Sequence, residues 1–235
     1  GKINGKEYIV KTIVTTETIK TIAERNGVEM YDVYTGFKWI ANVMRENEGK
    51  KNYIGGGEES YGFLCEDFVR DKDAVSACVI LAEIAAWAKD QGLSLYQLLQ
   101  KIYVEYGFSK EKGISVVKKG KSGAEEIEAM MKKFRENPLT EIAGSKVTYF
   151  YDYSTLKGKD YAENETVTLD MPTTSNVLQY FTEDNTKVSI RPSGTEPKIK
   201  FYCEVHSKVK SIDELPEAEK AAEEKINQIK ASLGI

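Results

Sequence analysis

The chain has 235 residues, which is more than one typical domain, and 33 lysines and arginines against 37 aspartates and glutamates give a net charge of −4. That charge provides no basic field for nucleic-acid binding, and no window is apolar for the length of a membrane span, so neither nucleic acid nor membrane is an expected partner. Three widely spaced cysteines, Cys65, Cys78 and Cys203, indicate reduced thiols in a cytoplasmic protein rather than disulfides or a zinc site.

The first half of the chain alternates strand and helix patterns. A β-branched run over residues 9–14 predicts a strand, and Thr15 and Thr16 are candidate caps of a helix that ends near Asn26. A second strand over 29–34 precedes a helix through Ile40, and a third run at 52–54 leads into the glycine-rich residues 55–62. This order predicts a mixed, mostly parallel α/β sandwich whose ligand loops lie beyond the carboxyl ends of strands.

The segment 74–90 is apolar on nearly every side and follows a good capping residue, Asp73, so we expect a deeply buried helix. A further helix should begin at Ser94 and end at Gly107. The pattern then changes to strand, helix, several strands and a final helix. We therefore expect two domains, 1–105 and 106–235, the second an α+β domain with an antiparallel sheet packed by helices.

Two details of the second half bear on its fold. Ser122 and Glu125 have capping-box spacing for a helix ending at Asn137. Apolar residues alternate with polar ones over 188–190 and again over 199–205, which predicts two half-buried strands on either side of a basic loop.

That loop, residues 191–198, carries the strongest functional signal of the chain. The Arg191 guanidinium offers a planar fork of donors, Ser193 and Thr195 add hydroxyls, and Gly194 lets the backbone approach a ligand closely. These groups together predict a phosphate site. The alternative is a polar hairpin connection, because proline, serine, glycine and threonine are ordinary turn residues.

A second candidate loop follows three glycines. Glu58 and Ser60 could bind the hydroxyls of a sugar, although a glycine-rich surface turn with solvated acids would look the same. Lys38, after Thr35 and Gly36, could touch a ligand oxyanion or be solvated at the start of a helix. His206, the only histidine, has no partners at metal-ligand spacing, so no metal site is predicted.

Four segments in order resemble the α-D-phosphohexomutase superfamily, closest to its phosphoglucomutase and phosphopentomutase branch. They are Thr35-Gly36-Phe37-Lys38, Gly57-Glu58-Glu59-Ser60-Tyr61-Gly62, Arg70-Asp71-Lys72-Asp73 and Arg191-Pro192-Ser193-Gly194-Thr195-Glu196-Pro197. The resemblance spans almost the whole chain and is limited to the third domain of that family, with the sugar-binding loop, and the fourth, with the phosphate-binding loop.

The resemblance implies roles for individual residues. Glu58 and Ser60 would bind sugar hydroxyls, and Thr35 and Lys38 would line the sugar site. Lys72 is the candidate catalytic residue for proton transfer, although its neighbour Asp71 could engage it as a surface pair. The phosphate that is not transferred would be held by the following residues: Arg191, Ser193, Gly194, Thr195 and Lys200.

The family moves a phosphoryl group between a phosphoserine and a sugar phosphate through a bisphosphate intermediate. The nucleophile segment and the magnesium loop of its first two domains are missing from this sequence, which also opens without a methionine. Because phosphoryl transfer needs a nucleophile and charge neutralisation, the chain alone is expected to be inactive. Magnesium, a sugar bisphosphate activator and the N-terminal domains are expected of a longer parent, and no cofactor is expected in this part.

The expected function is substrate recognition for a phosphoglucomutase that interconverts glucose 1-phosphate and glucose 6-phosphate, with a phosphorylated hexose as ligand. A phosphomannomutase or phosphopentomutase remains an alternative, because an epimer or a missing ring carbon changes contacts that a sequence does not show. A non-catalytic module that binds a phosphosugar through the same two loops is a further alternative.

Overall fold

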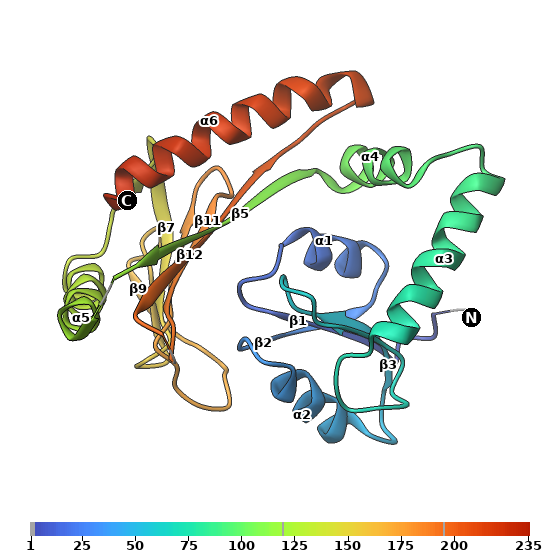
Figure 1. Ribbon diagram of the computed structural model, residues 1–235, viewed down its shortest axis with the longest axis horizontal. Coiled ribbons are helices and arrows are strands. Elements are labelled where there is room, and N and C mark those ends of the chain that lie inside the picture. The colour runs from blue at the N-terminus through green and yellow to red at the C-terminus, as the bar shows by residue number, and fades with distance from the viewer. Residues whose placement is uncertain (1–2, 119, 195) are drawn as a thin grey trace. The chain divides into compact units, whose positions relative to one another are not determined.

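The computed structural model describes residues 3–118, 120–194 and 196–235, without the side chain of Lys121. The chain separates into two compact units, Gly1–Gly107 and Phe108–Ile235, which we call unit 1 and unit 2 (Figure 1). Both combine helices with a sheet, and the expected α/β class is confirmed.

Unit 1 is built on a four-stranded sheet of order β2-β1-β3-β4. The central strand β1 (Glu7–Thr12) pairs in parallel with β2 (Glu29–Val33) and with β3 (Asn52–Gly57), and β4 (Phe63–Cys65) is antiparallel to β3. Strand β3 includes all three glycines, which the sequence had suggested were loop residues. The helices of the unit are α1 (Thr18–Arg25), α2 (Phe37–Asn47), α3 (Ala74–Asp90) and α4 (Leu95–Tyr106).

The core of unit 1 lies between one face of this sheet and α2. Alternate residues of β1, Tyr8 and Val10, point to that face because side chains alternate along a strand. They meet the residues that recur at helical spacing on α2, which are Phe37, Ile40 and Met44. The ends of β2 and β3 are thereby fixed, and both candidate loops of unit 1 start from them.

Residues 74–90 do form a helix, α3, but the expectation that this helix is buried is wrong. Asp73 caps α3 by accepting a hydrogen bond of 2.7 Å from the backbone N–H of Ser76. Of its described residues, however, Ala88 alone is buried, and Val75 is 73% exposed. The helix starts beside the edge strand β4, where the Asp73 N–H donates to the Phe63 carbonyl at 3.0 Å, and it leaves the core from there (Figure 1).

Unit 2 contains an antiparallel sheet of order β5-β12-β11-β10-β7-β8-β9, with β6 attached to β7. Its strands are β5 (Phe108–Val117), β6 (Glu141–Ile142), β7 (Ser145–Asp152), β8 (Lys157–Asp160), β9 (Glu165–Thr168), β10 (Leu178–Thr182), β11 (Lys187–Pro192) and β12 (Lys198–Ser207). Its helices are α5 (Gly120–Glu136), α6 (Leu215–Leu233) and the short η1 (Ile212–Glu214). Because α5 already begins at Gly120, Ser122 lies inside the helix, and the predicted capping box is wrong.

The two half-buried strands predicted around the basic loop are β11 and β12, which form an antiparallel pair. Their apolar residues are buried, with Ile190, Ile199 and Phe201 at 0% exposure. The Phe201 ring lies 6.4 Å from that of Phe134 on α5 in an edge-to-face arrangement. The buried side chains of β11 and β12 therefore hold the two ends of the basic loop in place. Farther along β12, burial raises the pKa of the Cys203 thiol to about 11.

Strand β5 lies at one edge of the unit 2 sheet and is tied to α6 by ion pairs. The Lys110 ammonium lies 3.0 Å from Glu219, and Lys112 lies 2.6 Å from Glu223. At the other edge, β9 is a short strand of mostly exposed residues. In the described part of the chain, no helix is both long and apolar enough to span a membrane.

Candidate functional site

In unit 2 the predicted phosphate loop begins at the end of β11. Arg191 is half-buried on this strand and pairs with Lys200 of β12. Residues directly opposite each other in an antiparallel pair share a face, so two cationic side chains emerge on the same face at the base of the loop. Such like-charge neighbours destabilise a sheet unless an anion lies between them or near them.

The turn itself is held by backbone hydrogen bonds. The Ser193 N–H donates to the Lys198 carbonyl at 2.8 Å, and the Lys198 N–H donates to the Glu196 carbonyl at 2.7 Å. An ion pair between Lys198 and Glu196 lowers the pKa of the Glu196 carboxyl. Gly194 is exposed, and an added Cβ there would meet no atom within 4 Å. The loop thus leaves open space at Gly194, while Thr195 lies outside the described residues.

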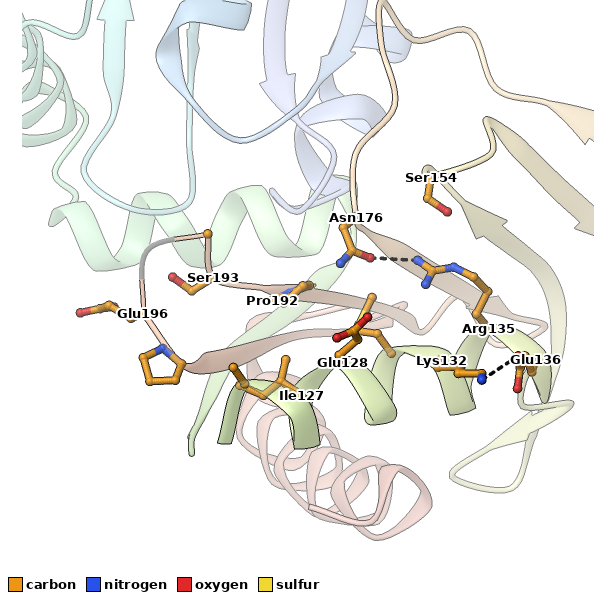
Figure 2. A pocket seen from close by; sticks show the side chains of 14 residues that line it. Ile127, Glu128, Lys132, Arg135, Glu136, Ser154, Asn176, Pro192, Ser193 and Glu196 are labelled. Carbon is orange, nitrogen blue, oxygen red and sulfur yellow. Dashed lines mark hydrogen bonds and ion pairs between the residues drawn. The ribbon is translucent and has the colours of Figure 1, made fainter. Parts of the chain in front are cut away.

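A pocket of about 730 Å³ opens between this loop and α5 (Figure 2). Its wall includes Ser193 and Gly194 and, across from them, Arg135, whereas Arg191 and Lys200 are not among the described residues that line it. The Arg135 side chain donates to the Asp152 carboxylate at 2.8 Å and to the Asn176 side-chain oxygen at 2.9 Å. Asp152 is almost fully buried, so the guanidinium is fixed at the wall. No sequence motif marked Arg135, because its partners come from distant segments.

In unit 1, the first two segments of the sugar site come together. The Glu58 carboxylate, just past β3, accepts a 2.6 Å hydrogen bond from the backbone N–H of Gly36, just past β2. The Glu58 N–H also donates to the Gly62 carbonyl at 2.7 Å, which closes the turn. Thr35 is half-buried beside Gly36, whereas Ser60 is exposed. The carboxyl ends of β2 and β3, the two strands that flank β1, therefore present Glu58, Ser60 and Thr35 at the same edge of the sheet.

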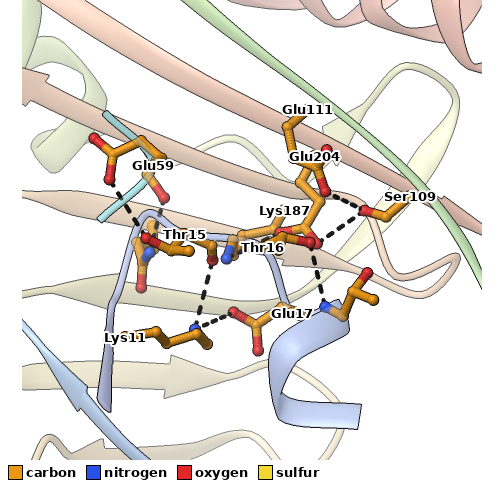
Figure 3. A network of polar contacts seen from close by, with 12 residues as sticks. Lys11, Thr15, Thr16, Glu17, Glu59, Ser109, Glu111, Lys187 and Glu204 are labelled. Atoms are coloured by element: carbon orange, nitrogen blue, oxygen red, sulfur yellow. Dashed lines mark hydrogen bonds and ion pairs between the residues drawn. The ribbon is translucent and has the colours of Figure 1, made fainter. Parts of the chain in front are cut away.

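Glu59 anchors the turn from the side of β1 (Figure 3). Its carboxylate accepts hydrogen bonds from the Thr12 hydroxyl at 3.2 Å and the Thr15 hydroxyl at 3.4 Å. Close to Thr15, the ammonium of Lys11 is 1% exposed and lies 3.0 Å from Glu17. The other Glu59 carboxylate oxygen accepts a 3.3 Å hydrogen bond from the Ser60 hydroxyl, so Glu59 links the turn to β1 and also engages Ser60.

The glycines before this turn are needed for close packing. A Cβ at Gly56 would lie 2.3 Å from the Val10 carbonyl oxygen, and one at Gly57 would lie 2.5 Å from the Gly62 carbonyl oxygen. Both distances are too short for real contacts. On the opposite side of the sheet from α2, the same strand borders an apolar groove of about 360 Å³. The run of glycines therefore permits the sheet pairing that places Glu58.

The two candidate lysines of unit 1 lie near the same segment. The Lys38 ammonium is exposed and lies 5.0 Å from the centre of the Trp39 ring. The Lys72 ammonium lies 6.0 Å from the centre of the Phe37 ring and forms the anticipated surface pair with Asp71 at 3.2 Å. That pairing lowers the pKa of Asp71, chiefly through the hydrogen bond from the backbone N–H of Lys72. Lys72 is thus brought toward the Thr35–Lys38 segment with its ammonium already engaged.

Across the part of the chain that the structure describes, no three or more histidine, cysteine or acidic residues come together in a way that could hold a metal ion. His206 lies near the end of β12.

Comparison with known families identifies both units. The model of the phosphoglucomutase/phosphomannomutase α/β/α domain III matches residues 1–106, and that of the C-terminal domain of the same family matches residues 115–222. A phosphoglucomutase of Staphylococcus haemolyticus is 36% identical over 204 residues, which cover 87% of this chain and 37% of the relative. A phosphoglucomutase of Staphylococcus aureus (strain bovine RF122 / ET3-1) is 40% identical over 194 residues, 83% of this chain and 35% of the relative. The chain thus spans little more than a third of these relatives.

Solved structures agree on the fold. Parafusin, a phosphoglucomutase of Paramecium, has a TM-score of 0.57 at 19% identity over 86% of this chain and 33% of its own. A putative phosphomannomutase of Thermus thermophilus has a TM-score of 0.55 at 18% identity over 94% of this chain and 37% of its own. With family models matching most of its length, the chain belongs to the phosphoglucomutase/phosphomannomutase family, of which it carries domain III and the C-terminal domain.

Proposed function

We propose that this chain is the substrate-recognition half of a phosphoglucomutase that interconverts glucose 1-phosphate and glucose 6-phosphate through a phosphoserine and a bisphosphate intermediate. In this proposal unit 2 holds the phosphate that is not transferred, and unit 1 recognises the sugar. The family membership and the name phosphoglucomutase of the relatives at 36% and 40% identity favour glucose phosphates as substrates.

The observation that carries the proposal is the pairing of Arg191 with Lys200 at the base of an open turn. A phosphate dianion would neutralise both cations, and the guanidinium matches two phosphate oxygens at once. The Ser193 hydroxyl, and the space at Gly194 for close backbone approach, would complete the contacts. Thr195 belongs to the same proposed set by its place in the loop.

The sugar would be recognised by Glu58 and Ser60, with Thr35 and Lys38 along the same region. One carboxylate oxygen of Glu58 accepts from the Gly36 N–H, and a sugar hydroxyl would donate to the same carboxylate. A fixed carboxylate discriminates between sugars because a misplaced hydroxyl leaves its charge without a partner. Lys72 is proposed for proton transfer, and release of its pair with Asp71 would be required for that role.

Catalysis would depend on the rest of a longer parent. The resemblance assigns the phosphoserine and a magnesium loop to the first two domains of the family, and a sugar bisphosphate would prime the serine. Within this chain, holding the spectator phosphate would orient the sugar so that its other end meets the phosphoryl donor. The chain alone is expected to bind substrate without turning it over.

Calorimetric titration of the chain with glucose 6-phosphate tests the binding role. Replacing Arg191→Ala should weaken binding by about 10- to 100-fold, because a charge-assisted contact is worth about 1.5–3 kcal/mol. The matched control is Lys146→Ala, which removes an exposed cation of β7 remote in the sheet order from the loop. Equal affinities of the three proteins would refute the assigned phosphate site.

Activity of the complete parent tests the reaction. With phosphorylated serine, magnesium and glucose 1,6-bisphosphate, it should convert glucose 1-phosphate faster than mannose 1-phosphate or ribose 1-phosphate. A preference for one of the other two would assign the phosphomannomutase or phosphopentomutase alternative. Absence of turnover on all three, with binding retained, would favour a non-catalytic phosphosugar-binding module.

A further inference from the structure

The pocket between α5 and the basic loop lies on the face of the unit 2 sheet opposite to the proposed phosphate site. Pro192 lines this pocket, and Ile190, two residues earlier on β11, is buried on the same face because side chains alternate along a strand. Arg191 lies between them in sequence and therefore points to the other face, as does its strand partner Lys200. The pocket is thus separate from the two cations that are proposed to hold the substrate phosphate.

At one end of the pocket, Arg135, Ser154 and Asn176 come together (Figure 2). Both oxygens of the buried Asp152 carboxylate are engaged there, one by the Arg135 side chain at 2.8 Å and the other by the Ser154 N–H at 3.0 Å and hydroxyl at 2.7 Å. A second N–H of Arg135 donates to the Asn176 side-chain oxygen at 2.9 Å, which leaves the NH2 group of that amide as a donor at the pocket wall. A guanidinium has more N–H donors than these two hydrogen bonds to described residues use, so further donors of Arg135 can meet a ligand.

The floor of the same pocket is apolar. Ile127 and Met131, one turn apart on α5, are 6% and 2% exposed, and they line the pocket together with Pro192 and Pro197 of the loop. The volume of about 730 Å³ lies in the range of about 300–1,000 Å³ that is usual for small-molecule sites, which combine an apolar lining with a few fixed polar groups. This lining suits a ligand with an apolar body.

The charges around the pocket favour a ligand with a single negative charge. The Arg135 guanidinium is already paired with Asp152, and Glu128, exposed on the same wall, adds a further negative charge. A dianion such as phosphate would gain little net attraction in these surroundings. A carboxylate carries one charge and matches the planar, paired N–H donors of a guanidinium.

We infer that this pocket is a binding site for a small monocarboxylate with an apolar body. The carboxylate accepts hydrogen bonds from Arg135 and from the Asn176 amide, and the apolar body packs on Ile127 and Met131. The inference is independent of the proposed function, because none of these four residues belongs to the proposed phosphate site or sugar site.

Calorimetric titration of the chain with 4-phenylbutyrate, a monocarboxylate with an aromatic end, tests this site. The first test variant is Asn176→Asp, which keeps the oxygen that accepts from Arg135 but replaces the amide donor with a like charge. It should weaken binding of 4-phenylbutyrate by at least about tenfold, as should a second variant, Arg135→Gln, because each loses a charge-assisted contact. The matched control is Lys133→Ala, an exposed cation of α5 outside the pocket lining, which should leave the affinity unchanged.

Two further titrations separate this site from the proposed phosphate site. The neutral amide of the same probe, 4-phenylbutanamide, should bind the wild type about tenfold more weakly than 4-phenylbutyrate, and Arg191→Ala should bind 4-phenylbutyrate as the wild type does. Loss of this binding in Arg191→Ala would overturn the inference, because the carboxylate would then occupy the proposed phosphate site.

Far-UV circular dichroism verifies that each variant is folded. Absence of binding at millimolar concentrations of 4-phenylbutyrate would overturn the inference. Equal affinities of the wild type and Asn176→Asp would also overturn it, because a carboxylate beside residue 176 cannot ignore a new negative charge there.

Discussion

Gly56 offers a sharp test of how the glycine run positions the sugar loop. In Gly56→Ala the new methyl would lie 2.3 Å from the Val10 carbonyl oxygen and 2.8 Å from the Tyr53 hydroxyl. The tyrosine could move, but the carbonyl belongs to β1, which is paired with β3 at this residue. Overpacking of this kind costs about 1–3 kcal/mol, and the lower entropy of the unfolded alanine chain returns about 0.4–1 kcal/mol. We therefore expect a net destabilisation of unit 1 by about 1–2 kcal/mol.

Urea denaturation followed by tryptophan fluorescence measures this effect in unit 1 alone, because both tryptophans, Trp39 and Trp87, lie there. The midpoint should fall by about 1 M for a urea dependence of about 1–2 kcal/mol per molar. The matched control is Gly55→Ala, whose methyl would meet its nearest atom, the Leu64 carbonyl oxygen, at 3.4 Å. The control should change stability by less than about 1 kcal/mol. Equal midpoints for the two variants would refute the packing argument.

Two further predictions concern unit 2. The thiol of Cys203 has its pKa raised by burial from 9.0 to about 11, so in alkaline solution the unfolded thiol ionises first and favours unfolding. The free energy of unfolding of the wild type should exceed that of Cys203→Ala by about 2 kcal/mol less at pH 11 than at pH 9. Urea titrations at both pH values measure this difference, and a difference that stays constant with pH would contradict the prediction. Arg135→Ala should destabilise unit 2 by about 2 kcal/mol, because the buried Asp152 carboxylate loses its partner. The control Lys132→Ala, on the same helix but mostly exposed, should cost less than about 0.5 kcal/mol. Thermal melts followed by circular dichroism measure both losses of stability, and similar losses would be evidence against the buried pair.

Local patterns predicted the order of elements well. The β-branched run before α1 became β1, and the alternation on either side of the basic loop became β11 and β12, because these patterns report directly which residues one face of a sheet buries. The rule that ligand loops follow strand ends placed Gly36 and Glu58 in loops beyond strand ends, and the structure joins them by a hydrogen bond.

The failures have a common physical cause. The apolar composition of α3 predicts that the helix prefers burial, but it does not say which surface covers it, and α3 stands largely exposed. Likewise, Arg135 is an ordinary charged residue near the end of a helix until β7 supplies Asp152 and a distant loop supplies Asn176. Contacts between segments far apart in sequence decide both cases, and periodicity carries no information about them.

The margins of the unit 2 sheet have a consequence for handling the protein in solution. Unpaired strand edges are templates on which other chains can add strands and begin to aggregate. Here β5 bears Lys110 and Lys112 along one margin, both fastened to α6, and β9 ends the other after a few polar residues such as Glu165 and Thr166. Neither margin offers a long, flat, apolar template, so concentrated samples of unit 2 should resist fibre formation through sheet extension.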